Sequence, residues 1–443
     1  MRKVLVANRG EIAVRVIRAC RELGLASVAV HSTADAEALH VRLADEAVEI
    51  GKPRPRDSYL NVDALLEACR ATGADAVHPG YGFLAENAAF ARALRDAGIT
   101  FVGPSPEVID RMGDKAAARR IAREAQVPTV PGVDGIADAD DAVRAAAEIG
   151  YPVMVKAAAG GGGRGIRIAA SEEELRQAVG QAAAEAESAF GDGSLYLEKL
   201  LVGARHVEVQ VLGDGHDAIH VFERECSLQR RRQKILEESP STALDDATRR
   251  ELCESAARLA RSVGYAGAGT LEYLLDASGD FYFIEMNTRI QVEHPVSEMV
   301  TGIDLVKEQL RIAAGGRLVH RQEDVVQRGH AIEFRINAED PDNGFMPSPG
   351  TIERLELPGG PGVRVDSAAY AGWTIPPFYD SLVGKLIVWG EDRTEAIARG
   401  RRALSELRVD GVSTTTALHL RLLDDPDVQA GAVDVAWLER WLG

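Results

Sequence analysis

The sequence predicts a doubly wound α/β fold for its first hundred residues, followed by two further domains. Short apolar stretches alternate with helical patterns in this first part, and such alternation is typical of a parallel sheet covered by helices. The proline-containing segment 103–106 marks a boundary, and a third unit with its own strands begins near Val319. At roughly 150 residues per domain, a chain of 443 residues has room for three domains.

Apolar periodicity predicts the elements of the first domain. Ile12, Val16, Ile17 and Cys20 fall on one face of a helix over 11–23, which Gly24 ends. The other expected elements are strands at 3–7, 27–31, 76–78 and 100–102 and helices at 62–72, 87–97 and 107–125. Ligand crevices in such sheets lie at the carboxyl ends of the strands. The polar segments 8–11 and 78–82 both follow strands and are therefore candidate ligand-binding loops.

Composition excludes several classes of protein. Asp and Glu outnumber Lys and Arg by 68 to 51, giving a net charge of −17, which disfavours binding to nucleic acid or to an anionic membrane. No stretch approaches the ~20 apolar residues of a membrane span, and the N-terminus lacks the apolar core of a signal peptide. The four cysteines form neither a disulfide framework nor a zinc-ligand pair. We therefore expect a cytoplasmic protein with reduced thiols.

A glycine-rich loop at 160–165 lies between a strand at 151–156 and a strand at 166–168. The helix that follows begins only at Ser171, with Glu174 completing a capping box. The dinucleotide-binding fingerprint requires a helix directly after the loop, and a P-loop requires Lys followed by Ser or Thr, so both motifs fail. Bare backbone amides beside Lys156 and Arg164 favour a lid over a polyphosphate. A flexible surface hairpin is the alternative.

Two glutamates face each other in a predicted hairpin with strands at 270–275 and 281–287. A register centred on the turn puts Glu272 opposite Glu285, an arrangement that destabilises a sheet unless a cation lies between them. Asn287 lies on the same face. Oxygen ligands alone favour Mg²⁺ or Mn²⁺ over zinc. The alternative is an exposed face whose glutamates are solvated.

The polar alternation continues along the chain through Arg289, Gln291 and Glu293. If this segment stays extended, its polar groups line one face, where they could bind a small oxyanion and accept a proton. The basic run 229–234 is either part of an anion site or a surface patch. In the third domain we expect strands at 331–336, 351–357 and 382–388, and the first of these carries Arg335 toward the same pocket.

Six motifs, in order along the chain, resemble those of biotin carboxylase, the ATP-grasp subunit of biotin-dependent carboxylases. They lie at 8–12, 78–82, 112–115, 160–165, 285–295 and 335–340. The resemblance implies an N-terminal α/β domain (1–113), an ATP-grasp domain (114–318) with a mobile lid at about 131–203, and a C-terminal α+β domain (319–443). It also implies the reaction of ATP, bicarbonate and biotin to ADP, phosphate and carboxybiotin, through carboxyphosphate.

The resemblance assigns roles to individual residues. ATP-binding positions are Lys115, Lys156, Gly161, Gly162, Gly163, Arg164, Gly165, Glu198, Lys199, Leu201, His206 and Gln229. Metal-binding positions, for two ions, are Glu272, Glu285 and Asn287. The bicarbonate and biotin site comprises Lys234, Arg289, Gln291, Val292, Glu293 and Arg335. Catalysis is assigned to Glu293 as the base, with Arg335, Lys234 and Arg289.

Two departures from the family pattern are expected to leave activity intact. Arg232 stands where relatives often have His, which should alter nucleotide affinity, and alanines at 158–159 shorten the glycine loop. The sequence has no biotin-attachment motif and no carboxyltransferase domain. We therefore expect biotin to be presented by a separate carrier protein, with a carboxyltransferase as a further partner, and the family implies a homodimer.

The acceptor of the carboxyl group stays open. Acetyl-CoA, as in fatty acid biosynthesis, is the first candidate, and propionyl-CoA and pyruvate are others. Two other functions are weighed against this one. Another bicarbonate-activating ATP-grasp ligase, similar to carbamoyl-phosphate synthetase, would not need the intact segment 289–293. A non-catalytic nucleotide-binding subunit would be expected to have lost Glu293, Lys234 or a metal-binding glutamate, and the sequence retains all of them.

Overall fold

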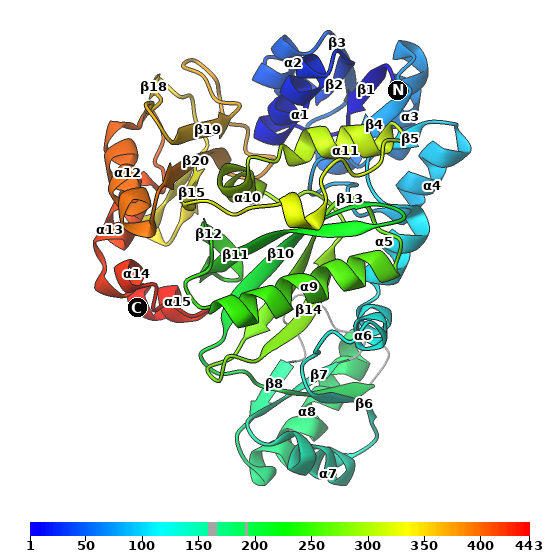
Figure 1. Ribbon diagram of the computed structural model, residues 1–443, viewed down its shortest axis with the longest axis vertical. Helices are drawn as coiled ribbons and strands as arrows, with labels where there is room; N and C mark the ends of the chain where they lie inside the picture. Colours follow the sequence, from blue (N-terminus) through cyan, green and yellow to red (C-terminus); the bar gives the residue numbers. More distant parts are fainter. Residues whose placement is uncertain (158–165, 191–193) are drawn as a thin grey trace. The chain divides into compact units, whose positions relative to one another are not determined.

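The computed structural model describes residues 1–157, 166–190 and 194–443. Two compact units divide the chain: unit 1 comprises residues 1–127, 205–273 and 285–443, and unit 2 comprises residues 128–204 and 274–284 (Figure 1). Across the described residues, no helix is both long enough and apolar enough to span a bilayer.

The N-terminal part of unit 1 is a five-stranded sheet with strand order β3-β2-β1-β4-β5, and every neighbouring pair is parallel. Its strands are β1 (Lys3–Val6), β2 (Ala26–Ser32), β3 (Glu46–Gly51), β4 (Ala76–His78) and β5 (Thr100–Phe101), and its helices are α1 (Gly10–Glu22), α2 (Leu39–Leu43), α3 (Val62–Thr72) and α4 (Ala88–Asp96). The predicted parallel sheet is confirmed. Only β3 and the short α2 were not expected from the sequence.

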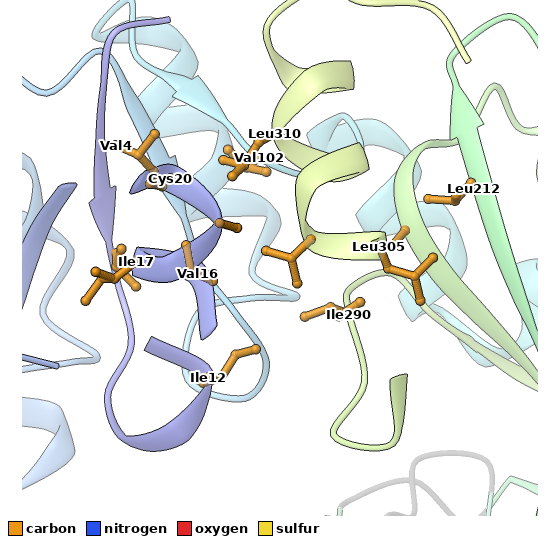
Figure 2. Packing of buried hydrophobic residues seen from close by; sticks show 14 of the residues in the cluster. Val4, Ile12, Val16, Ile17, Cys20, Val102, Leu212, Ile290, Leu305 and Leu310 are labelled. Carbon is orange, nitrogen blue, oxygen red and sulfur yellow. The ribbon is translucent and has the colours of Figure 1, made fainter. Parts of the chain in front are cut away.

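Successive residues of β1 point to opposite faces of this sheet and enter two different cores. Val4 and Val6 pack with Ile17 and other apolar residues of α1, whereas Leu5 packs with residues of α3 and α4. Helices therefore cover both faces, as the doubly wound arrangement requires. Figure 2 shows the first core, which also includes residues of α11 (Leu305–Ala313).

Substitution of Ile17 by Ala tests this core. The side chain is 1% exposed and packs against β1. We expect the unfolding free energy to fall by about 2–5 kcal/mol, because the substitution removes buried methyl groups and leaves a cavity. Urea denaturation would measure the loss. A change below about 0.5 kcal/mol would show that this core is not closely packed.

The helix predicted over 107–125 is wrong in one respect: the structure breaks it in two. Helix α5 (Pro106–Gly113) ends before Asp114, and α6 (Lys115–Glu124) begins after it. Asp114 is extended, with φ −81° and ψ 112°, and its carboxylate accepts a hydrogen bond from the amide of Ala117. An aspartate at an N-cap stabilises a helix start more than a helix interior, and this preference divides the apolar pattern.

The rest of unit 1 is organised around an eight-stranded sheet with order β14-β13-β10-β11-β12-β15-β20-β19, in which the end of β13 and the start of β14 belong to unit 2. Its strands are β10 (Arg205–Asp214), β11 (Ala218–Arg230), β12 (Gln233–Ser239), β13 (Ala266–Leu275), β14 (Phe281–Asn287), β15 (His330–Asn337), β19 (Val363–Ser367) and β20 (Leu382–Gly390). Four short strands pair separately: β16 (Glu339–Asp340), β17 (Met346–Pro347), β18 (Arg354–Glu356) and β21 (Arg408–Asp410). The strand expected at 351–357 is thus shorter than predicted.

Helices cover both faces of the eight-stranded sheet where β15 crosses it. Ile332, Phe334 and Ile336 of β15 point into a core formed with α12 (Arg393–Glu406) and α13 (Thr416–Asp424), whereas Ala331 packs against α10 (His294–Thr301) on the opposite face. Glu333 and Arg335 share that second face. The other helices of this part of unit 1 are α9 (Asp246–Ser262), α14 (Pro426–Ala430) and α15 (Trp437–Leu442).

Unit 2 contains a four-stranded antiparallel sheet with order β6-β9-β7-β8. Its elements are β6 (Gly132–Ile136), α7 (Ala139–Ile149), β7 (Val153–Ala157), β8 (Ile166–Ala169), α8 (Glu172–Phe190) and β9 (Leu195–Lys199). The pairing of β7 with β8 confirms the predicted hairpin, although its glycine-rich loop at 158–165 lies outside the described residues. Ser171 caps α8 by accepting from the amide of Glu174, whose carboxylate accepts from the amide of Ala170.

Candidate active site

A cavity of about 970 Å³ in unit 1 brings together segments that are far apart in the sequence. Residues 8–11 follow β1 and residues 81–83 follow β4, so the predicted crevice at the carboxyl ends of these strands is confirmed. Residues 232–234, the polar residues of 285–293, Arg335 and the segment 375–382 complete its lining.

Glu293 lies buried in this cavity between two cations. Lys234 Nζ is 2.6 Å from its Oε1, and Arg335 Nη2 is 2.9 Å from its Oε2. Burial opposes ionisation of the carboxyl, but the charges of Lys234 and Arg335 outweigh this effect and lower the pKa of Glu293. Glu293 is therefore ionised at neutral pH and able to accept a proton.

Lys234 is the charge that holds several carboxylates together. Its ammonium lies 2.5 Å from Glu208 Oε2 and 3.1 Å from Glu272 Oε1, in addition to Glu293. Burial alone would lower the pKa of Lys234, but these three anions raise it well above its ordinary value. Lys234 is thus buried among acids and is no part of a surface patch, whereas its role in an anion site stays a prediction.

A tight turn places Lys234 in this position. Strands β11 and β12 are joined by Arg231 and Arg232, whose φ angles of 48° and 66° are both positive, as in the two-residue turns that suit antiparallel hairpins. Arg232 is exposed and lines the cavity. The hairpin itself was not predicted, because the sequence 229–234 contains neither glycine nor asparagine.

The segment 285–293 is extended only as far as Asn287, where β14 ends, so the condition set for its polar groups to share one face is not met. Glu293 has φ −82° and ψ 10° and is the N-cap of α10, whose first turn contains Pro295. Proline favours the first turn of a helix, so the His-Pro pair starts a helix. The alternating polar residues nevertheless all line the cavity: Glu285, Asn287, Arg289, Gln291 and Glu293.

Hydrogen bonds fix the polar residues of this segment. Arg289 Nε donates to Glu86 Oε2 at 2.8 Å, and its Nη2 donates to Asn287 Oδ1 at 3.1 Å. Gln291 Nε2 donates to Glu272 Oε1 at 3.1 Å. The carbonyl of Val292 accepts from Lys385 Nζ at 2.8 Å. The predicted bicarbonate-binding residues thus lie together around Glu293.

The predicted metal-binding residues meet at one end of the cavity. Strands β13 and β14 are neighbours in the sheet, and Asn287 Nδ2 donates to Glu272 Oε1 at 2.9 Å. Burial and the negative charge of Glu272 raise the pKa of Glu285, while Lys115 Nζ lies 3.9 Å from its Oε2. Two mutually repelling carboxyls and an amide oxygen fit a hard cation such as Mg²⁺ or Mn²⁺. The directly opposed register of the two glutamates stays a prediction.

A second group of possible ligands shares Glu272. His206, Glu208 and Glu272 bring their ligand atoms within 4.8 Å of one another. Lys234 already supplies a positive charge between Glu208 and Glu272. We therefore favour Glu285 and Asn287 as the partners of Glu272 in holding an ion.

The predicted nucleotide-binding residues fall in both units. In unit 1, Gln229 Nε2 donates to His206 Nδ1 at 2.8 Å, and His206 Nε2 lies 3.2 Å from Glu272 Oε2. The two positions assigned to ribose contacts therefore touch each other, beside the predicted metal site.

In unit 2, the neighbouring strands β7 and β9 carry predicted nucleotide-binding positions. Lys156 forms an ion pair with Glu198, and Lys199 Nζ donates to the carbonyls of Gly150 and Tyr151, each at 2.9 Å. Leu201 follows the end of β9 and is partly buried. The predicted positions Gly161, Gly162, Gly163, Arg164 and Gly165 lie outside the described residues.

Sequence reasoning missed the buried charges that support the site. Glu208 on β10 and Arg224 on β11 are opposite each other and fully buried, with Arg224 Nε 2.6 Å from Glu208 Oε1. The alternation of His206, Glu208 and Gln210 with valines in β10 was a usable signal. Glu237, which was given no role from the sequence, forms an ion pair with Arg335, and burial raises its pKa to about 7.

Comparisons with known proteins agree along the chain. The family model of the biotin carboxylase N-terminal domain matches residues 1–109, that of the carbamoyl-phosphate synthase L chain ATP binding domain matches 114–321, and that of the biotin carboxylase C-terminal domain matches 333–440. A biotin carboxylase of Pseudomonas aeruginosa is 56% identical over 446 aligned positions, covering 100% of this chain and 99% of that protein.

Solved structures support the same assignment. The biotin carboxylase domain of a thermophilic 2-oxoglutarate carboxylase, bound to bicarbonate, is 50% identical with a TM-score of 0.95. The match covers 99% of this chain and 98% of the chain in that structure. The biotin carboxylase domain dimer of the Hydrogenobacter thermophilus 2-oxoglutarate carboxylase, in complex with MgADP, ADP and bicarbonate, is 51% identical with a TM-score of 0.91. The match covers 99% of this chain and 97% of the chain in that structure. The predicted three-domain ATP-grasp architecture is confirmed. The chain belongs to the biotin carboxylase family of ATP-dependent ligases.

Proposed function

We propose that this chain carboxylates biotin with bicarbonate and ATP at the cavity around Glu293, and that the biotin is presented by a separate carrier protein. One observation carries the proposal: a buried, ionised Glu293 lies between Lys234 and Arg335 in a cavity that also contains the paired carboxyls of Glu272 and Glu285. A base, two cations for an oxyanion and a site for a divalent cation are the groups that bicarbonate activation requires.

Bicarbonate would bind beside Lys234, Arg289 and the peptide of Val292. There it would share the positive charge that now lowers the pKa of Glu293, so that this pKa rises toward the value that a base needs. Glu293 would take the proton from bicarbonate. The freed oxygen would attack the γ-phosphorus of ATP, forming carboxyphosphate and releasing ADP.

Arg335 would serve the second step, in which the bond between carbon and the phosphate oxygen breaks, the departing phosphate takes the N–H proton of biotin, and the biotin nitrogen bonds to the carboxyl carbon. Its guanidinium is held by Glu237 and Glu293 and faces the cavity. A fixed guanidinium can stabilise both the carboxyphosphate and the enolate form of biotin without reorganisation. Water must be kept from the mixed anhydride, and we assign that role to closure of the lid, 131–203.

The nucleotide and metal roles follow the family pattern. Mg²⁺ or Mn²⁺ held by Glu272, Glu285 and Asn287 would neutralise phosphate charge. Lys115, Lys156 and the glycine loop would hold the phosphates. Glu198, Lys199 and Leu201 would bind adenine, and His206 and Gln229 would bind the ribose.

Replacing Glu285 with Gln tests the metal assignment. The substitution keeps the size of the side chain but removes one of two charges that attract the cation, so we expect the Mg²⁺ concentration for half-maximal ADP release to rise about tenfold or more, a change of about 1.4 kcal/mol. Titration of Mg²⁺ at fixed ATP would measure it. An unchanged requirement would remove Glu285 from the metal site.

The wider context is proposed on the same basis. A biotin carboxyl carrier protein, a carboxyltransferase, a homodimeric state and a cytoplasmic location all follow the family pattern, as do domain boundaries near 113 and 318. The acceptor stays open among acetyl-CoA and other acyl-CoA or keto-acid substrates, because the carboxyltransferase selects it. One similar structure, for example, belongs to a 2-oxoglutarate carboxylase.

ADP release from the purified protein with MgATP, omitting bicarbonate and free biotin in turn, tests the proposal. We expect release to require bicarbonate and to rise with biotin as carboxybiotin forms. Release that needs bicarbonate but ignores biotin would instead favour a different bicarbonate-activating ligase, of the kind that the central family model names. Nucleotide binding without any release, even with a carrier protein added, would favour a regulatory subunit.

A further inference from the structure

A row of charged residues crosses the buried face of the eight-stranded sheet behind the cavity. Lys385 of β20 is paired in register with Arg335 of β15 on one side and with Asp366 of β19 on the other. These side chains share one face of the sheet, since paired residues in antiparallel strands point the same way. The side chain of Lys385 is 0% exposed, so its charge must be balanced by neighbouring groups.

Lys385 contacts two segments that form walls of the cavity. Its Nζ lies 2.8 Å from the carbonyl oxygen of Val292 and 3.1 Å from Glu11 Oε1 in the first turn of α1. The hydroxyl of Tyr81 donates to the same Glu11 oxygen. Val292, Glu11 and Tyr81 all line the cavity, whereas Lys385 lies behind them.

The ammonium of Lys385 is charged despite its burial. Burial alone would lower its pKa, but the negative charges of Glu11, Glu333 and Asp366 outweigh that effect and raise it, while Arg364 opposes them. A charged donor makes a stronger hydrogen bond to a carbonyl than a neutral donor does. The bond to Val292 is therefore a firm restraint on the backbone.

We propose that Lys385 is a positioning residue for bicarbonate: it holds the peptide between Val292 and Glu293 and ties it, through Glu11, to Tyr81, which also lines the cavity. This inference rests on the proposed function of the cavity. Lys385 does not line the cavity, so it acts through the groups it holds and not by contact with substrate.

The geometry of the peptide bond explains how this restraint works. In a trans peptide the carbonyl and the following N–H point in opposite directions. Holding the Val292 carbonyl on Lys385 therefore turns the Glu293 N–H away from Lys385. That N–H belongs to the N-cap of α10, where backbone donors are unpaired within the helix and favour an anion. Without Lys385, this peptide could rotate and misplace both the N–H and the Glu293 side chain.

The test compares Lys385→Met with the double variant Lys385→Met/Glu11→Gln. The single variant leaves Glu11 as an unpaired buried acid, whereas the double variant also removes that charge and should fold more stably. Lys52→Met, at an exposed position, is the matched control. Steady-state ADP release is measured with bicarbonate and ATP varied separately, and thermal unfolding with and without MgADP verifies that each protein is folded.

We expect the KM for bicarbonate to rise about tenfold or more in both Lys385 variants, while the KM for ATP stays within about twofold and the control resembles the parent protein. A general structural defect would lower activity without separating the two substrates. An unchanged bicarbonate KM in the folded double variant, or equal changes in both KM values, would overturn the positioning role. A parent protein that binds MgADP but never releases ADP in response to bicarbonate would instead overturn the proposed function, and the positioning role with it.

Discussion

Replacing Glu293 with Gln is expected to lower bicarbonate-dependent ADP release by about 10²–10⁴-fold, the usual contribution of a general base. Glutamine preserves the size of the side chain but cannot take a proton. It also removes the negative charge between Lys234 and Arg335, so these cations remain available to bind an anion. We therefore expect the turnover number to fall much more than the affinity for MgATP.

The control for this variant is Glu254→Gln, at an exposed position on α9. Equilibrium titration with a fluorescent ADP analogue should give the same dissociation constant for parent, variant and control. Turnover of Glu293→Gln within about threefold of the parent would rule out Glu293 as the base, since loss of a general base costs far more.

Replacing Lys234 with Met is expected to be the most damaging single change to the site. It leaves Glu208, Glu272 and Glu293 close together without the ammonium that now lies within 3.1 Å of each. Removing one partner from a buried ionic group costs about 3–5 kcal/mol of unfolding free energy. Turnover should fall by at least about 10²-fold, because the anion loses a charged donor and the base loses its orientation.

The stability loss of Lys234→Met should depend on pH in a defined direction. Lys234 lowers the pKa values of Glu272 and Glu293 in the folded protein, so its stabilising effect is present above the unfolded pKa of about 4.3 and is lost as the pH falls below it. Urea denaturation at pH 7 and pH 4 should show the larger difference from the parent at pH 7, with Lys52→Met as the control. An equal difference at both pH values would contradict this electrostatic account.

Local patterns in the sequence were sufficient to predict much of the fold. The periodicity of Ile12, Val16 and Ile17 predicted α1, and the boundaries of α3 and β4 agree with those expected. The alternation of polar residues through Arg289, Gln291 and Glu293 predicted which side chains line the cavity, even though the strand ends at Asn287. These side chains line the cavity beyond the end of the strand because each of them is held by a hydrogen bond.

Other features depend on contacts that no local pattern contains. The apolar pattern of 107–125 fits one long helix and two shorter helices equally well. The structure has two helices because the carboxylate of Asp114 caps α6. Lys385 and Glu11 are 374 positions apart in the sequence and meet only through the folding of β20 against α1. Glu237 has no charged partner of opposite sign beside it in the sequence, whereas its actual partner, Arg335, comes from β15.

The most direct test of the account follows oxygen from bicarbonate. The parent protein is supplied with MgATP, biotin and ¹⁸O-labelled bicarbonate, and the phosphate and carboxybiotin are analysed by mass spectrometry. If Glu293 activates bicarbonate to attack ATP, each phosphate released with carboxybiotin carries one oxygen from bicarbonate, and the carboxyl group keeps the other two. Phosphate without label, released in equal amount with carboxybiotin, would contradict attack by bicarbonate and with it the assigned role of the Glu293 site.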